Sequence, residues 1–202
     1  AAGAGALLIA AKRVSGHGHV RVSGVERYQD VLELAKDGGL SESDLSRIRI
    51  GSYLDQPALP AADGIICNPP YIRHHRLGDD VKTTRRFALE RWLGITLDGR
   101  LGLHGYFFLT SLKSLKAGGR LAYITSADLY EGKSAHAIWT AIASKFRIDA
   151  IVTFDSDATP FPGVDTNPVI CLISAEPPRA TYTYVRVLRS ETTRLESVLK
   201  DI

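Results

Sequence analysis

The segment Asn68-Pro69-Pro70-Tyr71 holds the residues of this sequence best suited to chemistry, and it directly follows an apolar run that ends at Cys67. The prolines alone could simply mark the end of a strand, because Asn-Pro and Pro-Pro dipeptides end strands and begin turns. Consecutive prolines also fix φ and hold the preceding residues extended, so the side-chain carbonyl of Asn68 and the backbone carbonyl of Pro69 are positioned in advance. Two such acceptors beside an aromatic ring suggest a site that binds a planar group through hydrogen bonds and stacking.

This arrangement fits the modification of a planar amino group such as N6 of adenine. That nitrogen is a poor nucleophile, because its lone pair is delocalised into the ring. Two acceptors that hold both N–H bonds would draw it toward a tetrahedral, nucleophilic state. Tyr71 can stack on the base, as flipped bases are commonly held. We therefore predict that Asn68, Pro69, Pro70 and Tyr71 are the catalytic residues.

Gly3 and Gly5 form a second candidate site at the mouth of a predicted helix. Glycines allow a sharp turn and leave free N–H groups at the helix start. Glu26 follows 21 residues after Gly5, at the end of the next predicted strand, where nucleotide-binding α/β folds place an acid that accepts from ribose hydroxyls. A Gly/Ala-rich helix start with a surface glutamate would give the same pattern, so this signal is weak by itself.

The elements around these sites alternate between helix and strand patterns. Helices are predicted at 5–14, 27–39, 83–93, 106–116 (closed by Gly118-Gly119) and 134–146. Strands are predicted at 19–26, 47–52, 64–67, 120–126, 148–154, 168–174 and 181–188. The alternation predicts a three-layer α/β fold with a mostly parallel sheet, and the neighbouring strands 148–154 and 168–174 predict a closing antiparallel hairpin. No strand precedes the turn at Gly3, so the chain is expected to begin just after a first strand.

These motifs resemble Rossmann-like, S-adenosylmethionine-dependent methyltransferases, and most closely the γ-class N6-adenine DNA methyltransferases of restriction-modification and phage-defence systems. The similar segments run in order over nearly the whole chain: "AAGAGALL", "VSGVERYQDVLELA", "IRIGSYLD", "DGIICNPPY", "LHGYFFLTSLKSLKAGGRLAYITSADLY" and "FDSDATPFPGVDTNPVICLIS". The resemblance implies that residues 1–202 are one methyltransferase catalytic domain, without the first strand and without a target-recognition domain.

Roles for individual residues follow from this resemblance. It implies S-adenosylmethionine as cofactor, held by Gly3, Gly5, Glu26, Ser52 and Asn68. The family usually has an acid where this sequence has Ser52, and Asp55 is a weak substitute for it. It further implies that Phe161 faces the target base together with Tyr71, and that the partner is double-stranded DNA with a flipped adenine, read by a recognition domain or subunit outside this chain.

Charge and composition add a candidate DNA surface. Residues 72–100 hold seven Lys or Arg against four acids, a surplus equal to the whole net charge of +3. A solvated helical surface would look alike; under the methyltransferase interpretation, Arg73, His74, His75 and Arg76 are predicted to contact the DNA backbone. The histidines lack companions at metal-ligand spacing, so no metal is predicted. Two cysteines in apolar runs and the absence of a long apolar stretch favour a cytoplasmic protein without a membrane span.

Other functions remain open on the sequence alone. A protein glutamine-amide methyltransferase would use the same Asn-Pro-Pro-Tyr, because a side-chain amide poses the same problem of nucleophilicity. An RNA base N-methyltransferase is a second enzymatic alternative. A degenerate methyltransferase fold that serves as a scaffold or recognition subunit is the non-enzymatic one; Ser52 slightly favours it and the intact motif from Asn68 to Tyr71 opposes it.

Overall fold

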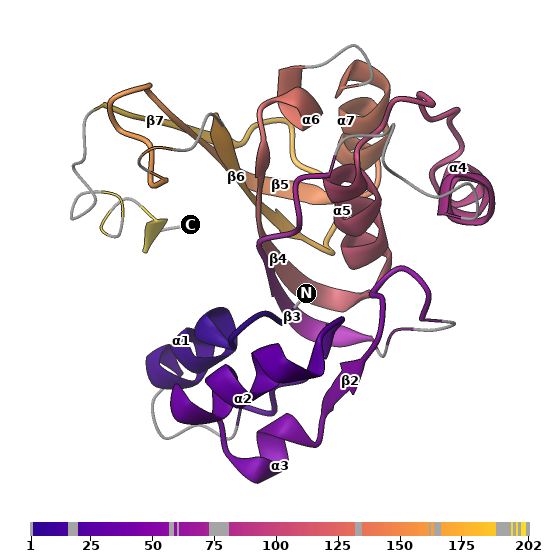
Figure 1. Cartoon of the computed structure of the whole chain (residues 1–202). Coiled ribbons are helices and arrows are strands. Elements are labelled where there is room, and N and C mark those ends of the chain that lie inside the picture. The colour runs from indigo at the N-terminus through magenta and orange to yellow at the C-terminus, as the bar shows by residue number, and fades with distance from the viewer. Residues whose placement is uncertain are drawn as a thin grey trace. The chain divides into compact units, whose positions relative to one another are not determined.

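The chain divides into two compact units, Ala1–Leu59 and Pro60–Ile202, drawn as a ribbon in Figure 1. The computed structural model describes residues 2–15, 20–56, 59, 61–72, 81–131, 135–161, 163, 167–188, 195, 197, 199 and 200. The catalytic motif predicted from the sequence lies in the second unit, whereas Gly3, Gly5, Glu26 and Ser52 lie in the first.

The described residues of the first unit form three helices and a two-stranded parallel sheet. The helices are α1 (Ala6–Val14), α2 (Gln29–Asp37) and α3 (Glu42–Leu45), and the strands are β1 (Gly24–Glu26) and β2 (Ile48–Ile50). The strands pair in a register that sets Glu26 opposite Ile50, so both residues end their strands at the same edge. The core is formed by the buried residues Val22, Ala35, Leu40 and Ile48, packed against Leu8, Ile9, Leu32 and Leu45 among others.

Local sequence explains where these helices begin and end. Helix α2 stops before Gly38-Gly39, two residues short of the predicted end at residue 39, and Gly39 adopts a φ of 108° that other residues rarely take. Helix α3, which the sequence analysis missed, begins at a capping box formed by Ser41 and Asp44. Asp44 also accepts a hydrogen bond from Lys12 of α1. That bond, together with those from Ser41, lowers the pKa of Asp44 to about 2 and ties α3 to α1.

A five-stranded sheet forms the centre of the second unit, in the order β3-β4-β6-β5-β7. The strands are β3 (Ala62–Cys67), β4 (Leu115–Ser126), β5 (Arg147–Phe154), β6 (Pro168–Ser174) and β7 (Thr183–Val187). Strands β3 and β4 are parallel, as are β5 and β7, and β6 runs antiparallel to both of its neighbours. Four of the five strands therefore point the same way, which confirms the mostly parallel sheet and the antiparallel hairpin of β5 and β6. The hairpin is not at the margin, because β6 inserts between β4 and β5.

Helices of the second unit pack against this sheet or against one another, and one of them contacts the loop that follows β3. They are α4 (Arg86–Leu93), which continues a π-helix η2 (Val81–Arg85), then α5 (Leu103–Lys113), α6 (Asp128–Glu131) and α7 (Ala135–Ala143). Helices α5 and α7 lie on one side of the sheet in Figure 1. Nearly all of α5 is buried, and its Phe108 ring packs 5.0 Å from Tyr123 of β4 and 5.7 Å from Trp139 of α7. Helix α5 is therefore a fixed element against which a loop can be held.

The prediction for Gly118-Gly119 was wrong. Helix α5 spans Leu103–Lys113 rather than residues 106–116, and the two glycines lie inside β4. They form an irregularity at which the register with β3 shifts, and Gly118 has a φ of 76°. A Cβ atom on Gly119 would lie 2.9 Å from the carbonyl oxygens of both Ala62 and Lys116. The glycine pair is thus required for a bulge in the strand. In the sequence alone, such a pair cannot be told from a glycine pair that ends a helix.

Both cysteines are free thiols, as predicted; Cys171 is buried in β6 and Cys67 is half-buried at the end of β3. Among the described residues, no helix is long and apolar enough to cross a membrane.

Candidate functional site

The motif Asn68 to Tyr71 begins where β3 ends, at Cys67. Strands β4 and β5 run in the same direction as β3, so Ser126 and Phe154 end at the same edge of the sheet. The carboxyl edge of a parallel sheet is where α/β folds place their ligands. The motif therefore stands at the sheet edge where chemistry is expected in this fold class.

Asn68 and Tyr71 are brought together by a direct hydrogen bond. The Tyr71 hydroxyl donates to Oδ1 of Asn68 at 3.0 Å. Asn68 is exposed and Tyr71 is 38% exposed, whereas Pro69 between them is buried. The buried proline fixes the turn, and the two polar side chains remain accessible from outside.

The end of this loop is attached to the start of helix α5. The N–H of Leu103 donates to the carbonyl oxygen of Ile72 at 2.9 Å, and the N–H of Ile72 donates to that of Pro70 at 3.1 Å. Helix N-termini have free N–H groups, and here one of them is used to hold the loop. The segment Asn68 to Tyr71 is thus held at both ends, by β3 before it and by α5 after it.

Tyr71 lies beside a histidine that the sequence analysis did not single out. The rings of Tyr71 and His104 have centroids 6.0 Å apart and planes inclined by 38°. Burial raises the pKa of Tyr71 to about 12, with a further contribution from Cys67, so its hydroxyl stays protonated and acts as a donor at neutral pH. The feature of the sequence that could have indicated His104 is its place inside the otherwise apolar run "LHGYFF".

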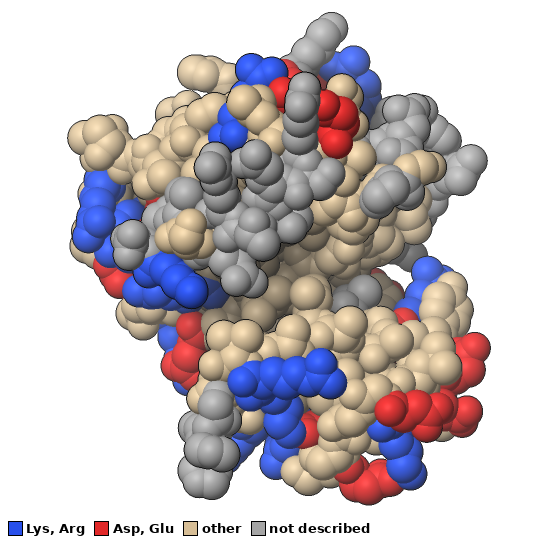
Figure 2. Space-filling model, turned by 90° about the vertical axis from the view of Figure 1, so that its left-hand side faces the viewer, with Lys and Arg blue, Asp and Glu red and all other residues tan. Residues whose placement is uncertain are grey.

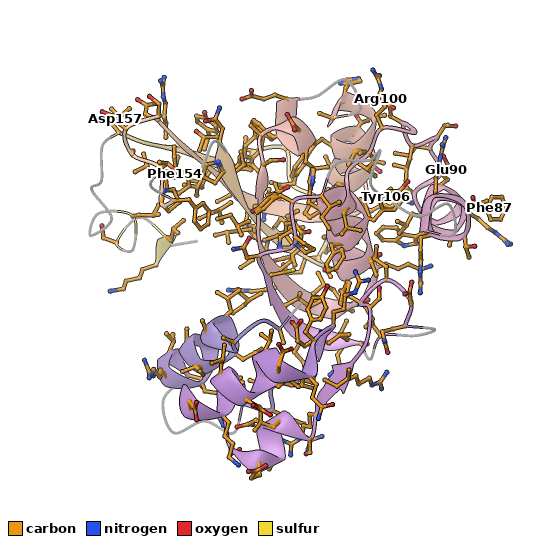
Figure 3. The ribbon with its side chains drawn as sticks, viewed as in Figure 1. Phe87, Glu90, Arg100, Tyr106, Phe154 and Asp157 are labelled. Atoms are coloured by element: carbon orange, nitrogen blue, oxygen red, sulfur yellow. The ribbon has the colours of Figure 1, made fainter. Side chains whose placement is uncertain are left out.

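Phe161 lies in the connection between β5 and β6, at the same edge of the sheet as Tyr71. It is half-buried, and its N–H donates to Oγ1 of Thr159 at 3.2 Å. Strands β4 and β6 separate β5 from β3, which corresponds to roughly 14 Å between their ends at the spacing of neighbouring strands. Figure 3 labels Phe154 and Asp157, where β5 ends and this connection begins. A common pocket for Phe161 and Tyr71 stays a prediction.

The described part of the basic segment is largely engaged within the second unit. Arg86 donates to Glu90 at 2.8 Å and Arg100 pairs with Asp98 at 2.9 Å. Glu90 also accepts from the N–H of Leu97 at 2.8 Å, which fixes the turn after α4. Phe87 of the same helix is 66% exposed and points outward, away from Tyr106 of α5. On the face drawn in Figure 2, basic and acidic side chains are interspersed.

The predicted DNA-backbone contacts Arg73, His74, His75 and Arg76 lie outside the described residues. Within the described ranges, no three His, Cys, Asp or Glu side chains come close enough to hold a metal ion.

In the first unit, Gly3 and Glu26 are brought together. The N–H of Gly3 donates to Oε2 of Glu26 at 2.7 Å, and the N–H groups of Arg27 and Tyr28 donate to Oε1 at 2.8 and 3.2 Å. Burial raises the pKa of Glu26, but these backbone hydrogen bonds outweigh it, so the net shift is downward. Glu26 is therefore a carboxylate at neutral pH, held at the end of β1 against the glycine turn.

The glycines of this turn are required by its geometry. Gly3 and Gly5 have φ angles of 56° and 77°, in the left-handed region. A Cβ atom on Gly5 would lie 2.9 Å from Leu40 and 3.0 Å from Ala35. Gly5 lets the chain enter α1 directly above the core, which leaves the N–H of Gly3 free to reach Glu26.

Ser52 follows β2 at the same edge and is half-buried. Its carbonyl oxygen accepts from Nε2 of Gln56 at 3.0 Å and from the N–H of Asp55 at 3.3 Å, which closes a turn. The sequence analysis missed two apolar side chains at this edge, Tyr28 (58% exposed) and Ile50 (48% exposed). In the sequence, Tyr28 comes two residues after Glu26 and Ile50 lies near the end of a predicted strand, and these positions could have indicated a binding role. A carboxylate at a strand edge that also carries exposed apolar side chains is suited to a nucleoside, whose ribose is polar and whose base is flat.

A family model described as the Eco57I restriction-modification methylase matches residues 61–161, half of the chain, including the whole Asn-Pro-Pro-Tyr motif and helix α5. The chain belongs to this family. That confirms the resemblance to restriction-modification methyltransferases inferred from the sequence.

Two relatives are similar in sequence. The type II methyltransferase M.XamI of Xanthomonas campestris pv. amaranthicola is 29% identical over 130 residues, which are 63% of this chain and 24% of the relative. The type II methyltransferase M.AccI of Acinetobacter calcoaceticus is 26% identical over 153 residues, 76% of this chain and 28% of the relative. The chain thus spans about a quarter of the length of these proteins.

Solved structures share the fold. A class I S-adenosylmethionine-dependent methyltransferase of Listeria monocytogenes superposes with a TM-score of 0.70 at 18% identity, over 100% of this chain and 61% of that one. The methyltransferase subunit of a type I restriction-modification system of Streptococcus thermophilus gives 0.72 at 18% identity, over 98% and 45%. These likenesses confirm the Rossmann-like methyltransferase fold.

Proposed function

We propose that this chain is the catalytic part of a DNA methyltransferase that transfers a methyl group from S-adenosylmethionine to N6 of adenine. The observation that carries the proposal is an exposed amide acceptor, Asn68, paired with the Tyr71 ring at the carboxyl edge of the sheet in a restriction-modification methylase family member. The type II methyltransferases named above support the reaction class.

In the proposed reaction, Asn68 and Pro69 hold the amino group of the target base. Oδ1 of Asn68 and the carbonyl oxygen of Pro69 accept its two N–H bonds, which concentrates the lone pair on the nitrogen and directs it outward. As the amino nitrogen forms the new N–CH₃ bond, the S–CH₃ bond of the donor would break, its electron pair would leave with S-adenosylhomocysteine, and the amino nitrogen would lose one proton to solvent. These acceptors act in the transition state, because charge develops on the nitrogen only as the bond forms.

Tyr71 supplies the stacking surface for the base. Its hydroxyl occupies one lone pair of the Asn68 oxygen, and a carbonyl oxygen has two. The base can therefore share this oxygen with Tyr71 or displace the hydroxyl. In either case the Tyr71 ring lies beside the acceptor oxygen, and a flipped base needs both a stacking surface and a hydrogen-bond partner.

The residues of the first unit fit S-adenosylmethionine. When bound, this cofactor supplies an electrophilic methyl group on a sulfonium sulfur. Glu26 retains lone pairs beyond its three backbone hydrogen bonds and can accept from ribose hydroxyls. Exposed Tyr28 and Ile50 offer apolar faces to the adenine ring. Gly3 and Gly5 leave the turn bare for close approach, and Ser52 lies at the same edge.

The proposed partner is double-stranded DNA with a flipped adenine, recognised by a domain or subunit outside this chain. Arg73, His74, His75 and Arg76 are assigned to its backbone, and Phe161 to the target base opposite Tyr71. These assignments rest on the sequence pattern and on the position of Phe161 after β5.

The proposal is tested with the full-length protein that contains this chain. Radiolabelled S-adenosylmethionine is offered with genomic DNA, total RNA and a glutamine-bearing protein in separate reactions, and cofactor binding is measured by calorimetry. We expect label in DNA and far less of it after Asn68→Ala. Label in RNA or protein alone would replace the proposal with one of the alternative enzymes, and cofactor binding without transfer to any substrate would replace it with a scaffold.

A further inference from the structure

His104 is a buried titratable residue to which the proposed mechanism assigns no role. It is 9% exposed and is the second residue of α5, next to the catalytic loop. Its Nδ1 atom is buried and has no hydrogen-bond partner among the described residues. An unpartnered buried polar atom costs stability, whereas an apolar ring in the same place would not. The contact of this ring with Ser126 uses Nε2, so Nδ1 itself gives no reason of stability for a histidine at this position.

The closest aromatic neighbour of this ring on the catalytic loop is Tyr71. The 6.0 Å separation of the centroids and the 38° inclination lie within the range of favourable aromatic pairs. The neighbouring residue Leu103 holds the same loop through the carbonyl of Ile72. The start of α5 thus contacts the loop twice, once through its backbone and once through the His104 ring.

The His104 ring is held on two sides, and the backbone of the same residue is held by a third contact. Its Nε2 lies 3.3 Å from Oγ of Ser126, the last residue of β4. Its Cε1–Nδ1 edge lies against Gly102, where a Cβ atom would come within 2.7 Å of Cε1. Its backbone carbonyl accepts from the buried Tyr123 hydroxyl at 2.7 Å. A ring fixed in this way can determine the position of the more exposed Tyr71 ring beside it.

Both rings are uncharged at neutral pH. Burial lowers the pKa of His104, with Asp128 acting weakly in the opposite direction, and burial raises that of Tyr71. The contact is therefore one of packing between neutral rings, and the exposed side of Tyr71 remains available to a ligand.

We propose that His104 is a positioning residue: its ring, oriented by Ser126, supports Tyr71 beside Asn68 so that the target base stacks in the reactive position. This inference rests on the proposed function. His104 does not touch the substrate and acts only through Tyr71.

The test uses the full-length protein and four variants: His104→Ala, His104→Phe, Tyr71→Ala and the double variant His104→Ala/Tyr71→Ala. Tyr106→Phe is the matched control, because it removes from α5, two residues away, another buried polar atom that has no hydrogen-bond partner among the described residues. The kcat and KM for methyl transfer to DNA and the melting temperature are measured for each. We expect His104→Ala to lower kcat about tenfold at unchanged KM for the cofactor, His104→Phe to recover most of it, and Tyr106→Phe to change nothing.

The double variant separates positioning from a general structural role. If His104 acts through Tyr71, the double variant is no slower than Tyr71→Ala. Losses that multiply, or an unchanged kcat in His104→Ala, would overturn the proposal.

A spectroscopic measurement keeps the inference testable if the full-length protein transfers no methyl group. Tyrosines are replaced by 3-fluorotyrosine, and the fluorine line of Tyr71 is assigned by its loss in Tyr71→Phe. We expect this line to shift or broaden in His104→Ala and to stay in place in Tyr106→Phe. Absence of methyl transfer together with this shift would refute the proposed function and leave the positioning role in place; an unmoved line would refute the positioning role.

Discussion

Asn68→Ala is the substitution that isolates the proposed catalytic acceptor. Asn68 is exposed and its described side-chain hydrogen bond is the one from Tyr71, at 3.0 Å. An exposed bond of this kind contributes about 1 kcal/mol or less to folding, so the free energy of unfolding should hardly change. The loss of one pre-organised polar partner in a transition state costs about 3 kcal/mol, which corresponds to a fall in kcat of ~10²–10³.

Asn68→Asp is the matched control, because it keeps an oxygen acceptor at the same position. The assay is methyl transfer to DNA by the full-length protein under saturating cofactor, together with calorimetric cofactor binding and thermal unfolding of each variant. We expect Asn68→Ala to lose transfer while binding and melting temperature stay close to wild type, and Asn68→Asp to fall between the two. Turnover of Asn68→Ala within a few-fold of wild type would refute the role of Asn68 as acceptor.

Three further predictions concern the cofactor site and the fold. Glu26→Gln should weaken S-adenosylmethionine binding, measured by calorimetry, because it removes the charge that accepts from ribose; unchanged affinity would mean that another group holds the ribose. The pKa of the Asp44 carboxyl is lowered to about 2, so this group stabilises the folded state above the pKa of its unfolded form, near 4, and the contribution is lost as the pH falls toward 2. In Asp44→Asn, the free energy of unfolding measured with urea should therefore depend less on pH between about 4 and 2. A pH dependence equal to that of wild type would contradict this. Gly119→Ala should lower the free energy of unfolding by about 1–3 kcal/mol, because its Cβ would meet two backbone oxygens at 2.9 Å; a melting temperature equal to wild type would show that the bulge is not constrained.

The sequence predicts those parts of the fold that depend on local patterns. Alternating apolar residues and turn glycines locate α1, α2, β5 and β6 within a few residues. The geometry of Gly3 and Glu26 also follows from spacing, because a glycine turn and a strand end meet at one edge of a parallel pair.

Long-range contacts account for what the sequence analysis missed. Gly118-Gly119 resembles a helix stop until β3 is paired with β4 and the bulge becomes visible. His104 lies 33 residues from Tyr71 in the chain, and only the packing of α5 against the end of β4 brings the two rings together. Tyr28 and Ile50 are ordinary apolar residues in the sequence, and their exposure at a strand edge is a property of the folded unit.

The identity of the methylated atom tests the central claim most directly. The full-length protein is incubated with genomic DNA and S-adenosylmethionine that carries a deuterated methyl group, the DNA is digested to nucleosides, and the products are identified by mass spectrometry. We predict deuterated N6-methyl-2′-deoxyadenosine, lower by about a hundredfold or more when the Asn68→Ala reaction is sampled at the same early time. Label on cytosine, or no label on any deoxynucleoside while RNA or protein is labelled, would contradict the proposal that Asn68 to Tyr71 holds the amino group of adenine.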